Sequence, residues 1–547
     1  MKQPLKIALL GISSQYIHSN LAPWCLVNGL KTYAKADHQA VVVEGTVNEP
    51  VQNILERVIL EQPDLLGVSC YIWNIQTVET LLPQVKKTLP ACLIALGGPE
   101  VGFRAQDALL SFPEADFVFS GEGELPFAKL TDALCGFEEL KNVPGLSCRE
   151  EGTLKISGPF LHEKTQGSPY TEDYLLALNG RIAYLETSRG CPYSCAFCLS
   201  GRKEKLRQAP LDQAFADILL LANSGAKTVK LVDRTFNADR ARALLILRFI
   251  ASEHGKGIPE GVTFHFEIAG DLLDEDTLAF LRTVPKGLFQ FEIGLQSMDE
   301  KTLRLVRRNT DMAYLIRQVR QLIQMETAHV HLDLIAGLPQ EDLSAFIKGF
   351  DQAYLLRPHA LQLGFLKLIH GSAMREEGGK YPCAFDPLPP YEVRSTPFMS
   401  ESDFAVLKTA ERALDKLHNS GRFPRTLRFL TEEMEFQPFD LFLNLGRAII
   451  IAEGEGSSLP LDKLNDCLAG HTAIIPILVG SDENAFLLSN MLRHKGVFVP
   501  PAVFPAVPKG KARLRFCVVS EHKEEQIIRA LDALVEAAQE AGIELPA

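Results

Sequence analysis

The sequence lacks the features that would place it in a membrane or on a nucleic acid. None of its apolar runs approaches the roughly 20 residues that a membrane-spanning helix needs. The segment Met1 to Gly11 holds one short apolar run with no cleavage-site pattern behind it, so we expect no signal peptide. Basic residues form no blocks, and the formal net charge is −12. These absences predict a cytoplasmic protein without membrane contact, and they do not indicate nucleic-acid binding.

The composition is that of an ordinary folded protein, with 46% apolar and 23% charged residues. A chain of 547 residues exceeds the size of one hydrophobic core, so we expect about three domains. An odd count of 11 cysteines without an export signal indicates reduced thiols. Eight of them, such as Cys70 and Cys92, are expected to be small buried side chains.

The first 150 residues alternate short apolar runs with longer mixed stretches, which is typical of a doubly wound, Rossmann-like α/β domain. The expected strands are Ile7–Leu10, Ala40–Val43, Leu65–Ser69, Leu93–Leu96 and Phe117–Phe119. Glycine-bearing loops follow three of these strands, at the edge where such sheets bind ligands, although glycines can also simply end strands. A G-x-G-x-x-G fingerprint is missing, so the pattern does not support a dinucleotide.

Residues 151–180 are largely polar and predict an interdomain linker. A second series of strand and helix pairs follows over 181–395 and predicts a partial (β/α)6 barrel of the TIM type. Its expected strands are Ile182–Ser188, Thr228–Asp233, Thr263–Ile268, Leu288–Gly294, Val330–Ala336 and Leu361–Leu368. Residues 396–547 predict a mostly helical accessory domain with an amphipathic helix near Glu524–Glu540.

Three cysteines, Cys191, Cys195 and Cys198, lie in the loop after the first expected barrel strand. Three thiolates from one short loop can bind three irons of a [4Fe–4S] cubane and leave the fourth iron open for chemistry. A structural zinc site is the alternative, but it normally takes four protein ligands, and no fourth Cys or His lies nearby at matching spacing. Three unrelated thiols are the other alternative.

The spacing C-x3-C-x2-C, with Phe197 before the last cysteine, resembles the signature of the radical SAM superfamily. The resemblance implies that the open iron binds the amino and carboxylate groups of S-adenosylmethionine (SAM). One electron, supplied by a reductant such as flavodoxin or ferredoxin, then cleaves SAM to a 5′-deoxyadenosyl radical. Chemistry of this kind requires anaerobic conditions.

Further motifs imply contacts to SAM at the strand ends. Asp233, Arg234 and Thr235 end the second barrel strand, where the family carries a glycine-rich motif that meets the methionyl amine; this sequence departs from that motif. The segments 292–297 and 333–339 resemble those of oxygen-independent coproporphyrinogen oxidase. The remaining SAM-contacting residues implied by that resemblance are Glu267, Gln296, Arg308 and Asp333. A carboxylate suits ribose hydroxyls and Arg308 suits the SAM carboxylate, although each residue alone is more often a strand-end polar group.

The first domain resembles the cobalamin-binding domain that precedes the barrel in cobalamin-dependent radical SAM proteins. The resemblance implies that Ser69, Gly97 and Gly98 hold the nucleotide tail of the corrinoid, because small residues let the backbone approach closely. The related motif D-x-H-x-x-G is reduced here to its histidine, His18. His18 is expected to ligate cobalt, line the pocket or cap the following helix, and these alternatives stay open.

The whole chain resembles an uncharacterised subgroup of these proteins that carries a C-terminal domain of unknown function. The resemblance implies a cobalamin-dependent radical SAM enzyme, most simply a methyltransferase acting on an unactivated carbon of an unidentified substrate. Cyclisation or rearrangement without methyl transfer is one alternative, and a non-catalytic corrinoid- or cluster-binding sensor is another. The sequence assigns no catalytic residue.

Overall fold

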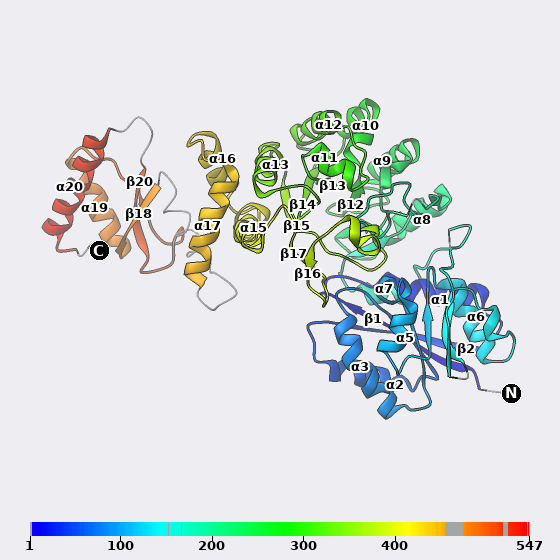
Figure 1. Cartoon of the computed structure of the whole chain (residues 1–547). Coiled ribbons are helices and arrows are strands. Elements are labelled where there is room, and N and C mark those ends of the chain that lie inside the picture. The colour runs from blue at the N-terminus through cyan, green and yellow to red at the C-terminus, as the bar shows by residue number, and fades with distance from the viewer. Residues whose placement is uncertain are drawn as a thin grey trace. The chain divides into compact units, whose positions relative to one another are not determined.

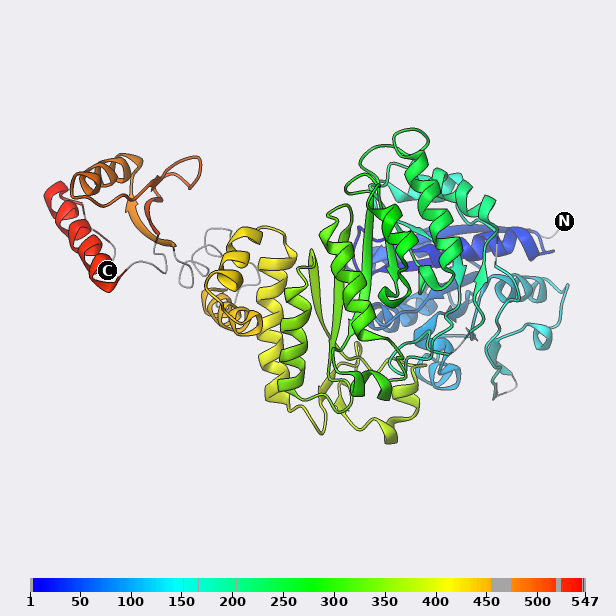
Figure 2. The same cartoon turned by 90° about the horizontal axis from the view of Figure 1, so that it is seen from above.

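The computed structural model describes residues 3–150, 152–165, 167–202, 204–453, 474–517, 523–543 and 545. It divides into two compact units, Met1–Ala405 and Val406–Ala547. The larger unit contains two α/β bodies that follow one another along the chain (Figures 1 and 2). Each unit is described separately below.

The first body is built on a seven-stranded sheet in the order β2-β1-β3-β4-β5-β6-β7. Its strands are β1 (Leu5–Ser13), β2 (His38–Thr46), β3 (Leu65–Ser69), β4 (Leu93–Gly97), β5 (Phe117–Phe119), β6 (Leu146–Glu150) and β7 (Thr153–Lys155). The first five pair in parallel and confirm the expected strands, whereas β6 and β7 add an antiparallel edge that was not expected. Seven consecutive residues of β1 are buried, as in a sheet covered on both faces.

Helices cover both faces of this sheet. They are α1 (Leu21–Tyr33), α2 (Val51–Glu61), α3 (Ile75–Thr88), α4 (Pro99–Gly102), α5 (Ala105–Ser111) and α6 (Glu124–Leu134). Ile54 of α2 and Leu81 of α3 belong to one hydrophobic core, and Leu30 of α1 and Phe127 of α6 belong to a second. Two cores with the sheet between them confirm the doubly wound architecture.

The segment expected to be a linker contains regular structure. Strand β7 and helix α7 (Glu172–Leu178) both lie within residues 151–180. The side chain of Thr171 caps α7 by accepting a hydrogen bond from Tyr174 N, and Tyr174 is fully buried. The polar composition of this segment is therefore that of caps and turns around a docked helix.

The second body contains six parallel strands whose spatial order equals their chain order. They are β8 (Ala183–Leu185), β11 (Thr228–Leu231), β12 (Thr263–Ile268), β13 (Phe289–Gln296), β14 (His329–Ala336) and β15 (Ala360–Phe365). The intervening helices are α8 (Leu211–Ala222), α9 (Arg240–Glu253), α10 (Glu275–Leu281), α11 (Glu300–Leu305), α12 (Met312–Gln324) and α13 (Leu343–Leu355). Strands β8 and β15 are the open edges, so the sheet is a partial barrel as expected (Figure 1).

Two short strand pairs and a short helix also belong to the larger unit. Strands β9 (Ser188–Arg189) and β10 (Arg207–Gln208) pair antiparallel around the cysteine loop. Helix α14 (Ala373–Glu376) and the antiparallel pair β16 (Ala384–Phe385) and β17 (Val393–Ser395) follow β15.

The second unit is mostly helical, as expected, but it also contains a small sheet. Its helices are α15 (Glu401–Ala413, which begins in the larger unit), a π-helix (Leu414–Asn419), α16 (Pro424–Glu432), α17 (Pro438–Glu453), α19 (Asp482–His494) and α20 (Glu524–Ala541). Helix α20 confirms the expected amphipathic helix. Strands β18 (Ile474–Gly480), β20 (Ala512–Cys517) and β19 (Pro501–Ala502) form an antiparallel sheet in that order, which the sequence analysis missed.

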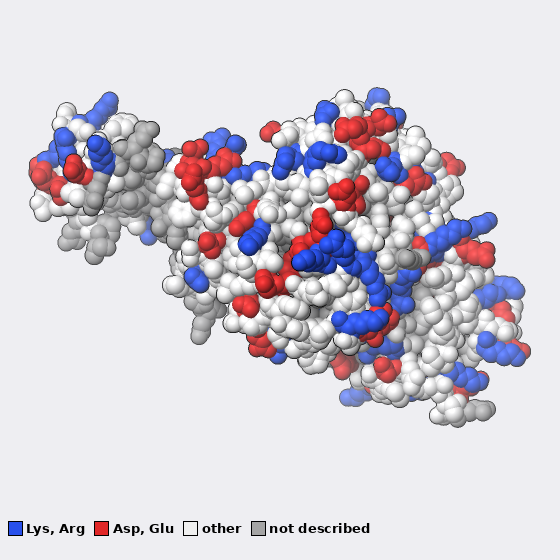
Figure 3. All heavy atoms as spheres, turned by 45° about the horizontal axis from the view of Figure 1, so that its top comes forward, with Lys and Arg blue, Asp and Glu red and all other residues white. Residues whose placement is uncertain are grey.

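Within the described ranges, no helix combines the length and apolar character required to cross a bilayer. Figure 3 shows acidic and basic side chains interspersed on one face of the molecule.

Candidate functional site

The cysteine loop follows strands β8 and β9 and is anchored by main-chain hydrogen bonds. Ala196 N donates to Val306 O at 2.8 Å, and Met374 N donates to Ala196 O at 2.9 Å. Cys191 and Cys195 are buried and Cys198 is half-buried, and none of the three forms a disulfide. The loop therefore presents three reduced thiols from a fixed backbone.

Burial affects the protonation of two of the three thiols in the cysteine loop. Burial raises the pKa of Cys195, although the nearby Arg308 guanidinium opposes the shift, and burial also raises the pKa of Cys198. Metal binding would therefore have to displace thiol protons. No three His, Cys, Asp or Glu side chains of the described residues are grouped as a site for one ion. Thiolates of a cubane bind different irons, so they need not converge on one point.

A cavity of about 140 Å³, here called the barrel cavity, lies beside this loop at the carboxyl ends of the barrel strands. It brings together six of the seven residues predicted to contact SAM. They are Arg234, Thr235, Glu267, Gln296, Arg308 and Asp333, and Cys195 of the cluster loop lines the same cavity. Tyr193, Asp271 and Asn309 also line it and were missed, because no sequence motif marked them.

Asp233, the seventh predicted SAM residue, does not line this cavity. It is 1% exposed, and its carboxylate accepts hydrogen bonds from Thr187 N at 2.8 Å, Thr187 Oγ1 at 2.6 Å and Ser188 Oγ at 2.7 Å. These three hydrogen bonds hold the carboxylate of Asp233 inside the protein. Asp233 thus braces the strand that leads into the cysteine loop through its side chain, and its expected contact to SAM stays a prediction.

Carboxylates on three neighbouring strands crowd the floor of the barrel cavity. Burial, together with the charges of Glu292 and Glu267, raises the pKa of Asp333 to about 8. Burial and Glu292 also raise the pKa of Glu267. Burial opposes ionisation of Glu292 as well, but a hydrogen bond from His265 (2.8 Å) and the ammonium of Lys230 (3.1 Å) lower its pKa to about 2. Glu292 is therefore the ionised carboxylate, and Asp333 retains its proton at neutral pH.

Asp333 also has an oxygen without a hydrogen bond. Its Oδ1 atom is buried and has no hydrogen-bond partner, although His331 Nε2 lies 3.2 Å away. A buried polar atom of this kind normally has a partner. An oxygen facing a cavity suits a hydroxyl of a bound ribose.

Gln296 and Arg308 meet at an irregular point of strand β13. Gln296 has a φ of 68°, a conformation that is uncommon outside glycine, and the strand register shifts between Gly294 and Gln296. A Cβ on Gly294 would lie 2.0 Å from Gln296 Nε2, so only glycine leaves room for this amide. Arg308 Nη2 donates to Gly294 O at 2.5 Å, while its buried Nε has no partner. Gln296 and Arg308 thus both line the cavity, and the planar guanidinium is a group suited to a carboxylate ligand.

A second cavity, of about 900 Å³, is here called the corrinoid cavity. All four residues predicted to contact cobalamin line it, namely His18, Ser69, Gly97 and Gly98. Gly98 has a φ of 102°, and a Cβ there would lie 2.5 Å from Cys70 O, so the main chain requires glycine. A Cβ on Gly97 would meet no protein atom closer than Phe119 Cβ at 3.9 Å. Gly97 thus leaves a vacant surface against which a ligand can pack, and the size of the cavity fits a large cofactor.

His18 lies where the two bodies of the larger unit meet. Its Nδ1 atom is 2.8 Å from the hydroxyl of Tyr184 in β8, and the two rings stack. Burial and the charge of Lys230 lower the pKa of His18, which favours the neutral imidazole. His18 does not cap α1, whose N-cap residue is Asn20. His18 thus lines the cavity, and because a neutral imidazole held at Nδ1 keeps its other nitrogen available, cobalt ligation stays a prediction.

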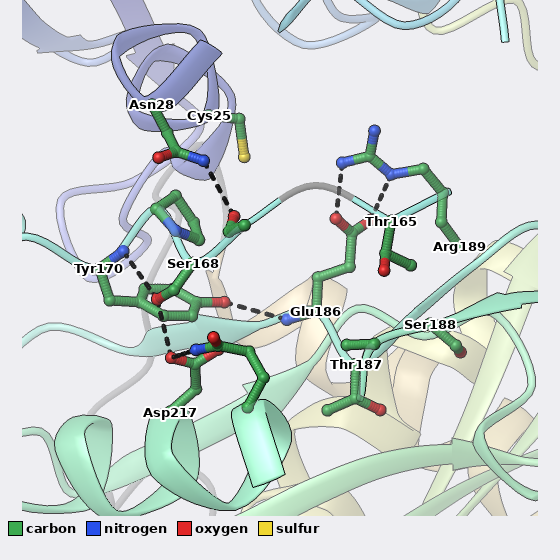
Figure 4. Close-up of a pocket in the computed structure, with 14 residues that line it drawn as sticks. Cys25, Asn28, Thr165, Ser168, Tyr170, Glu186, Thr187, Ser188, Arg189 and Asp217 are labelled. Atoms are coloured by element: carbon green, nitrogen blue, oxygen red, sulfur yellow. Dashed lines mark hydrogen bonds and ion pairs between the residues drawn. The ribbon is translucent and has the colours of Figure 1, made fainter. Parts of the chain in front are cut away.

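An ion-pair network surrounds Arg189, two residues before the first cluster cysteine. Arg189 lies 2.6 Å from Glu186, 2.9 Å from Glu124 and 3.5 Å from Glu122. Figure 4 shows the Glu186–Arg189 pair at one side of a pocket of about 30 Å³, with Cys25 and Asn28 of α1 above it. Sequence reasoning missed this network, because its members come from both bodies and no spacing relates them. The lining of this small pocket thus comes from both bodies of the larger unit.

Comparison with known families identifies the parts of the chain. Residues 185–352 match the radical SAM superfamily, residues 9–131 match the B12 binding domain, and residues 379–448 match a protein family of unknown function, DUF4080. The matched domains imply a [4Fe–4S] cluster, SAM and cobalamin as cofactors. The chain thus combines a segment that matches the radical SAM superfamily with a segment that matches the B12 binding domain.

The curated relatives include two methyltransferases from bacteria. The chain is 27% identical over 376 residues to the cobalamin-dependent radical SAM methyltransferase TokK of Streptomyces tokunonensis, covering 63% of this chain and 53% of that protein. It is 29% identical over 365 residues to 2-(S-pantetheinyl)-carbapenam-3-carboxylate methyltransferase of Streptantibioticus cattleyicolor, covering 61% of this chain and 52% of that protein. The chain thus spans about half the length of these relatives.

Solved structures share the fold. The cobalamin-dependent SAM radical enzyme OxsB, with aqua-cobalamin and SAM bound, matches with a TM-score of 0.61 and 15% identity, over 99% of this chain and 81% of that one. The methyltransferase TsrM of Kitasatospora setae, with cobalamin and a [4Fe–4S] cluster bound, matches with a TM-score of 0.55 and 17% identity, over 68% of this chain and 77% of that one.

Proposed function

Because this chain combines matches to the radical SAM superfamily and to the B12 binding domain, we propose that it is an enzyme that cleaves SAM reductively and methylates an unactivated carbon. The observation that carries the proposal is the junction of the two cavities. Arg234 lines both the barrel cavity and the corrinoid cavity. A substrate at this junction is within reach of groups bound in either cavity, which is the proximity that a two-cofactor reaction needs.

We assign the residues of the barrel cavity to SAM. Arg308 binds the SAM carboxylate through its unsatisfied Nε, and Gln296 fixes the position of that guanidinium. Asp333 and Glu267 accept hydrogen bonds from the ribose hydroxyls. Cys191, Cys195 and Cys198 hold the cluster, which supplies the electron for SAM cleavage when bound. Cys195 lines the same cavity as Arg308, so the bound SAM and the cluster lie next to each other.

The residues of the corrinoid cavity are assigned to cobalamin, which supplies a methyl carrier when bound. Gly97 and Gly98 admit the cofactor close to the backbone, and Ser69 lies beside them at the end of β3. Ser69 Oγ donates to Leu10 O at 3.2 Å, which leaves its oxygen lone pairs for the ligand. His18, oriented by Tyr184, faces the same cavity.

Methyl transfer is supported by the names of the two bacterial relatives, both of which are methyltransferases. The B12-binding domain agrees with that chemistry. No residue of the barrel or corrinoid cavity favours cyclisation or rearrangement over methylation, so we propose methylation as the reaction class.

The test is anaerobic reconstitution of the full chain with iron, sulfide and cobalamin, followed by incubation with SAM and reduced flavodoxin. Without added substrate we expect 5′-deoxyadenosine from uncoupled SAM cleavage and S-adenosylhomocysteine from transfer of the SAM methyl group to the reduced cobalamin, both measured by mass spectrometry. A C191A/C195A/C198A variant is the control. It should produce no 5′-deoxyadenosine and should show no absorbance from a cluster.

The products also separate the alternatives. Formation of 5′-deoxyadenosine without S-adenosylhomocysteine would replace methylation with cyclisation or rearrangement. A protein that binds the cluster and cobalamin but forms neither product would be a sensor and not an enzyme.

A further inference from the structure

Arg234 occupies the boundary between the two cavities. Among the described residues it is the only one that lines both of them. It follows strand β11, and its guanidinium acts electrostatically on Tyr71 of the first body, on Cys198 of the cluster loop and on Glu267 of β12. The cation therefore lies near the first body, the cluster loop and strand β12, at the place where we propose that the substrate binds.

Arg234 has neither an ion pair nor a hydrogen bond through its side chain in the described structure, and it is exposed to the cavities. The other cavity arginines are occupied. Arg189 pairs with three glutamates, and Arg202 donates to Gly371 O at 2.7 Å and pairs with Glu376 at 2.8 Å. Arg308 donates to Gly294 O. Arg234 is thus the available cation at the junction.

Arg308 already provides for the carboxylate of SAM, since its Nε is buried without an acceptor. Arg234 lines the same cavity, and a second arginine exceeds what one carboxylate needs, because one guanidinium can satisfy a carboxylate through two parallel hydrogen bonds. Val232 and Leu199 present apolar surface to the corrinoid cavity near this position. A ligand at the junction therefore meets one cation beside an apolar wall.

We infer that Arg234 binds an anionic group, a carboxylate or a phosphate, on the molecule that this protein modifies. This departs from the sequence expectation that Arg234 contacts SAM. The identification of the ligand as the substrate rests on the proposed function, whereas the anion site itself does not. An anchored anion at the cavity junction would fix which carbon of the substrate faces the two cofactors.

The probe is a matched pair of small molecules that differ in charge. Radiolabelled benzoate is dialysed to equilibrium against the cluster- and cobalamin-loaded full chain, with and without saturating SAM. Unlabelled benzoate, phenyl phosphate and neutral benzamide then compete. We expect benzoate or phenyl phosphate to bind at least about tenfold more tightly than benzamide, because a guanidinium recognises the charge. The tighter of the two anions identifies the substrate group as carboxylate or phosphate.

The variants R234Q, R234K and R308Q separate this site from the SAM site. R234Q should weaken benzoate binding at least about tenfold, and R234K should retain part of it because the charge remains without the planar fork. R234Q should change the dissociation constant of SAM by less than about threefold, whereas R308Q should raise it about tenfold or more.

Four results would overturn the inference. Equal benzoate binding by wild type and R234Q would mean that Arg234 holds no anion, and so would failure of both anions to bind. Loss of SAM binding in R234Q, together with displacement of benzoate by SAM, would assign Arg234 to SAM. Benzoate binding by the cobalamin-free chain that is lost when cobalamin is loaded would assign Arg234 to that cofactor's phosphate. Because dialysis needs no turnover, a wild type that holds benzoate but forms no 5′-deoxyadenosine would reject the proposed function alone.

Discussion

Arg189 Nη2 lies 2.9 Å from Glu124 Oε1, and this ion pair joins the strand before the cluster loop to the helix that follows strand β5 of the B12-binding domain. The side chains are 20% and 5% exposed. The contact links the cluster-binding and corrinoid-binding bodies through an ion pair. An ion pair of this kind depends on the orientation of its two side chains, whereas an apolar contact does not.

Replacement of Arg189 should destabilise the larger unit. R189M leaves Glu122, Glu124 and Glu186 without their shared cation, and breaking a buried ion pair from one side costs about 3 kcal/mol. R189K should lie between wild type and R189M, because lysine cannot satisfy several carboxylates with a planar fork. Thermal unfolding measures the effect. R304M removes an exposed pair with Glu300 and should change the unfolding temperature little, so equal effects of R189M and R304M would contradict the assignment.

Each cluster cysteine should be necessary for iron binding. C191A, C195A and C198A each remove one of three thiolates, so we expect loss of bound iron and of the charge-transfer absorbance after anaerobic reconstitution. C517S is the matched control, since Cys517 is exposed and lies in the other unit. If C517S lost iron to the same extent, or if C195A kept a full complement, the assignment of the ligands would be wrong.

The two glycines of the corrinoid cavity should behave differently. G98A forces an unfavourable φ and a contact of 2.5 Å with Cys70 O, so it should lower the unfolding temperature and abolish cobalamin retention. G97A meets no close protein atom, so the fold should tolerate it. Its methyl group adds to the wall of the cavity, so cobalamin affinity should fall about tenfold. Cobalamin absorbance after gel filtration measures retention. Unchanged cobalamin binding by G97A would show that the cofactor does not approach this backbone.

Asp333 should make the larger unit less stable as the pH rises. Its carboxyl ionises near the ordinary value of 3.8 in the unfolded chain and near 8 in the folded protein. Between these values the unfolded state loses its proton first, so stability falls from about pH 4 to about pH 8 and levels off above that range. D333N removes this dependence. The unfolding temperature of D333N minus that of wild type should therefore increase toward pH 8.

Asp299 provides a control of opposite sign. Although burial opposes ionisation, hydrogen bonds from Thr302 lower the pKa of Asp299, which caps α11. Stability from this carboxylate is present above its ordinary pKa and is lost as the pH falls through the lowered value. D299N should therefore reduce the unfolding temperature at neutral pH, and its difference from wild type should shrink in acid. A D333N variant that followed the same pattern would refute the raised pKa of Asp333.

Local patterns in the sequence were sufficient for much of the fold. Strands β3, β5 and β12 begin and end where the apolar runs do, because burial in a parallel sheet selects continuous apolar residues over a few positions. The spacing of Cys191, Cys195 and Cys198 indicated the cluster loop for a similar reason, since one short loop determines which atoms its thiols can reach. Strands β18 and β20 of the second unit escaped detection, since β18 contains Pro476, which argues against a strand, and β20 alternates arginines with apolar residues. Their pairing comes from distant segments and leaves little local pattern.

The sequence by itself determined which chemistry-bearing residues follow which strand. Only the tertiary structure decided where each side chain points and what it meets. Asp233 and Arg234 are neighbours in the chain, yet the first turns inward to Thr187 and Ser188 while the second faces both cavities. The physical reason is that the side chains of successive residues in extended backbone point to opposite sides. What each side chain then meets depends on the segments packed on its side. The ion pairs of Arg189 and the contact of His18 with Tyr184 likewise depend on how two separately folded sheets come together.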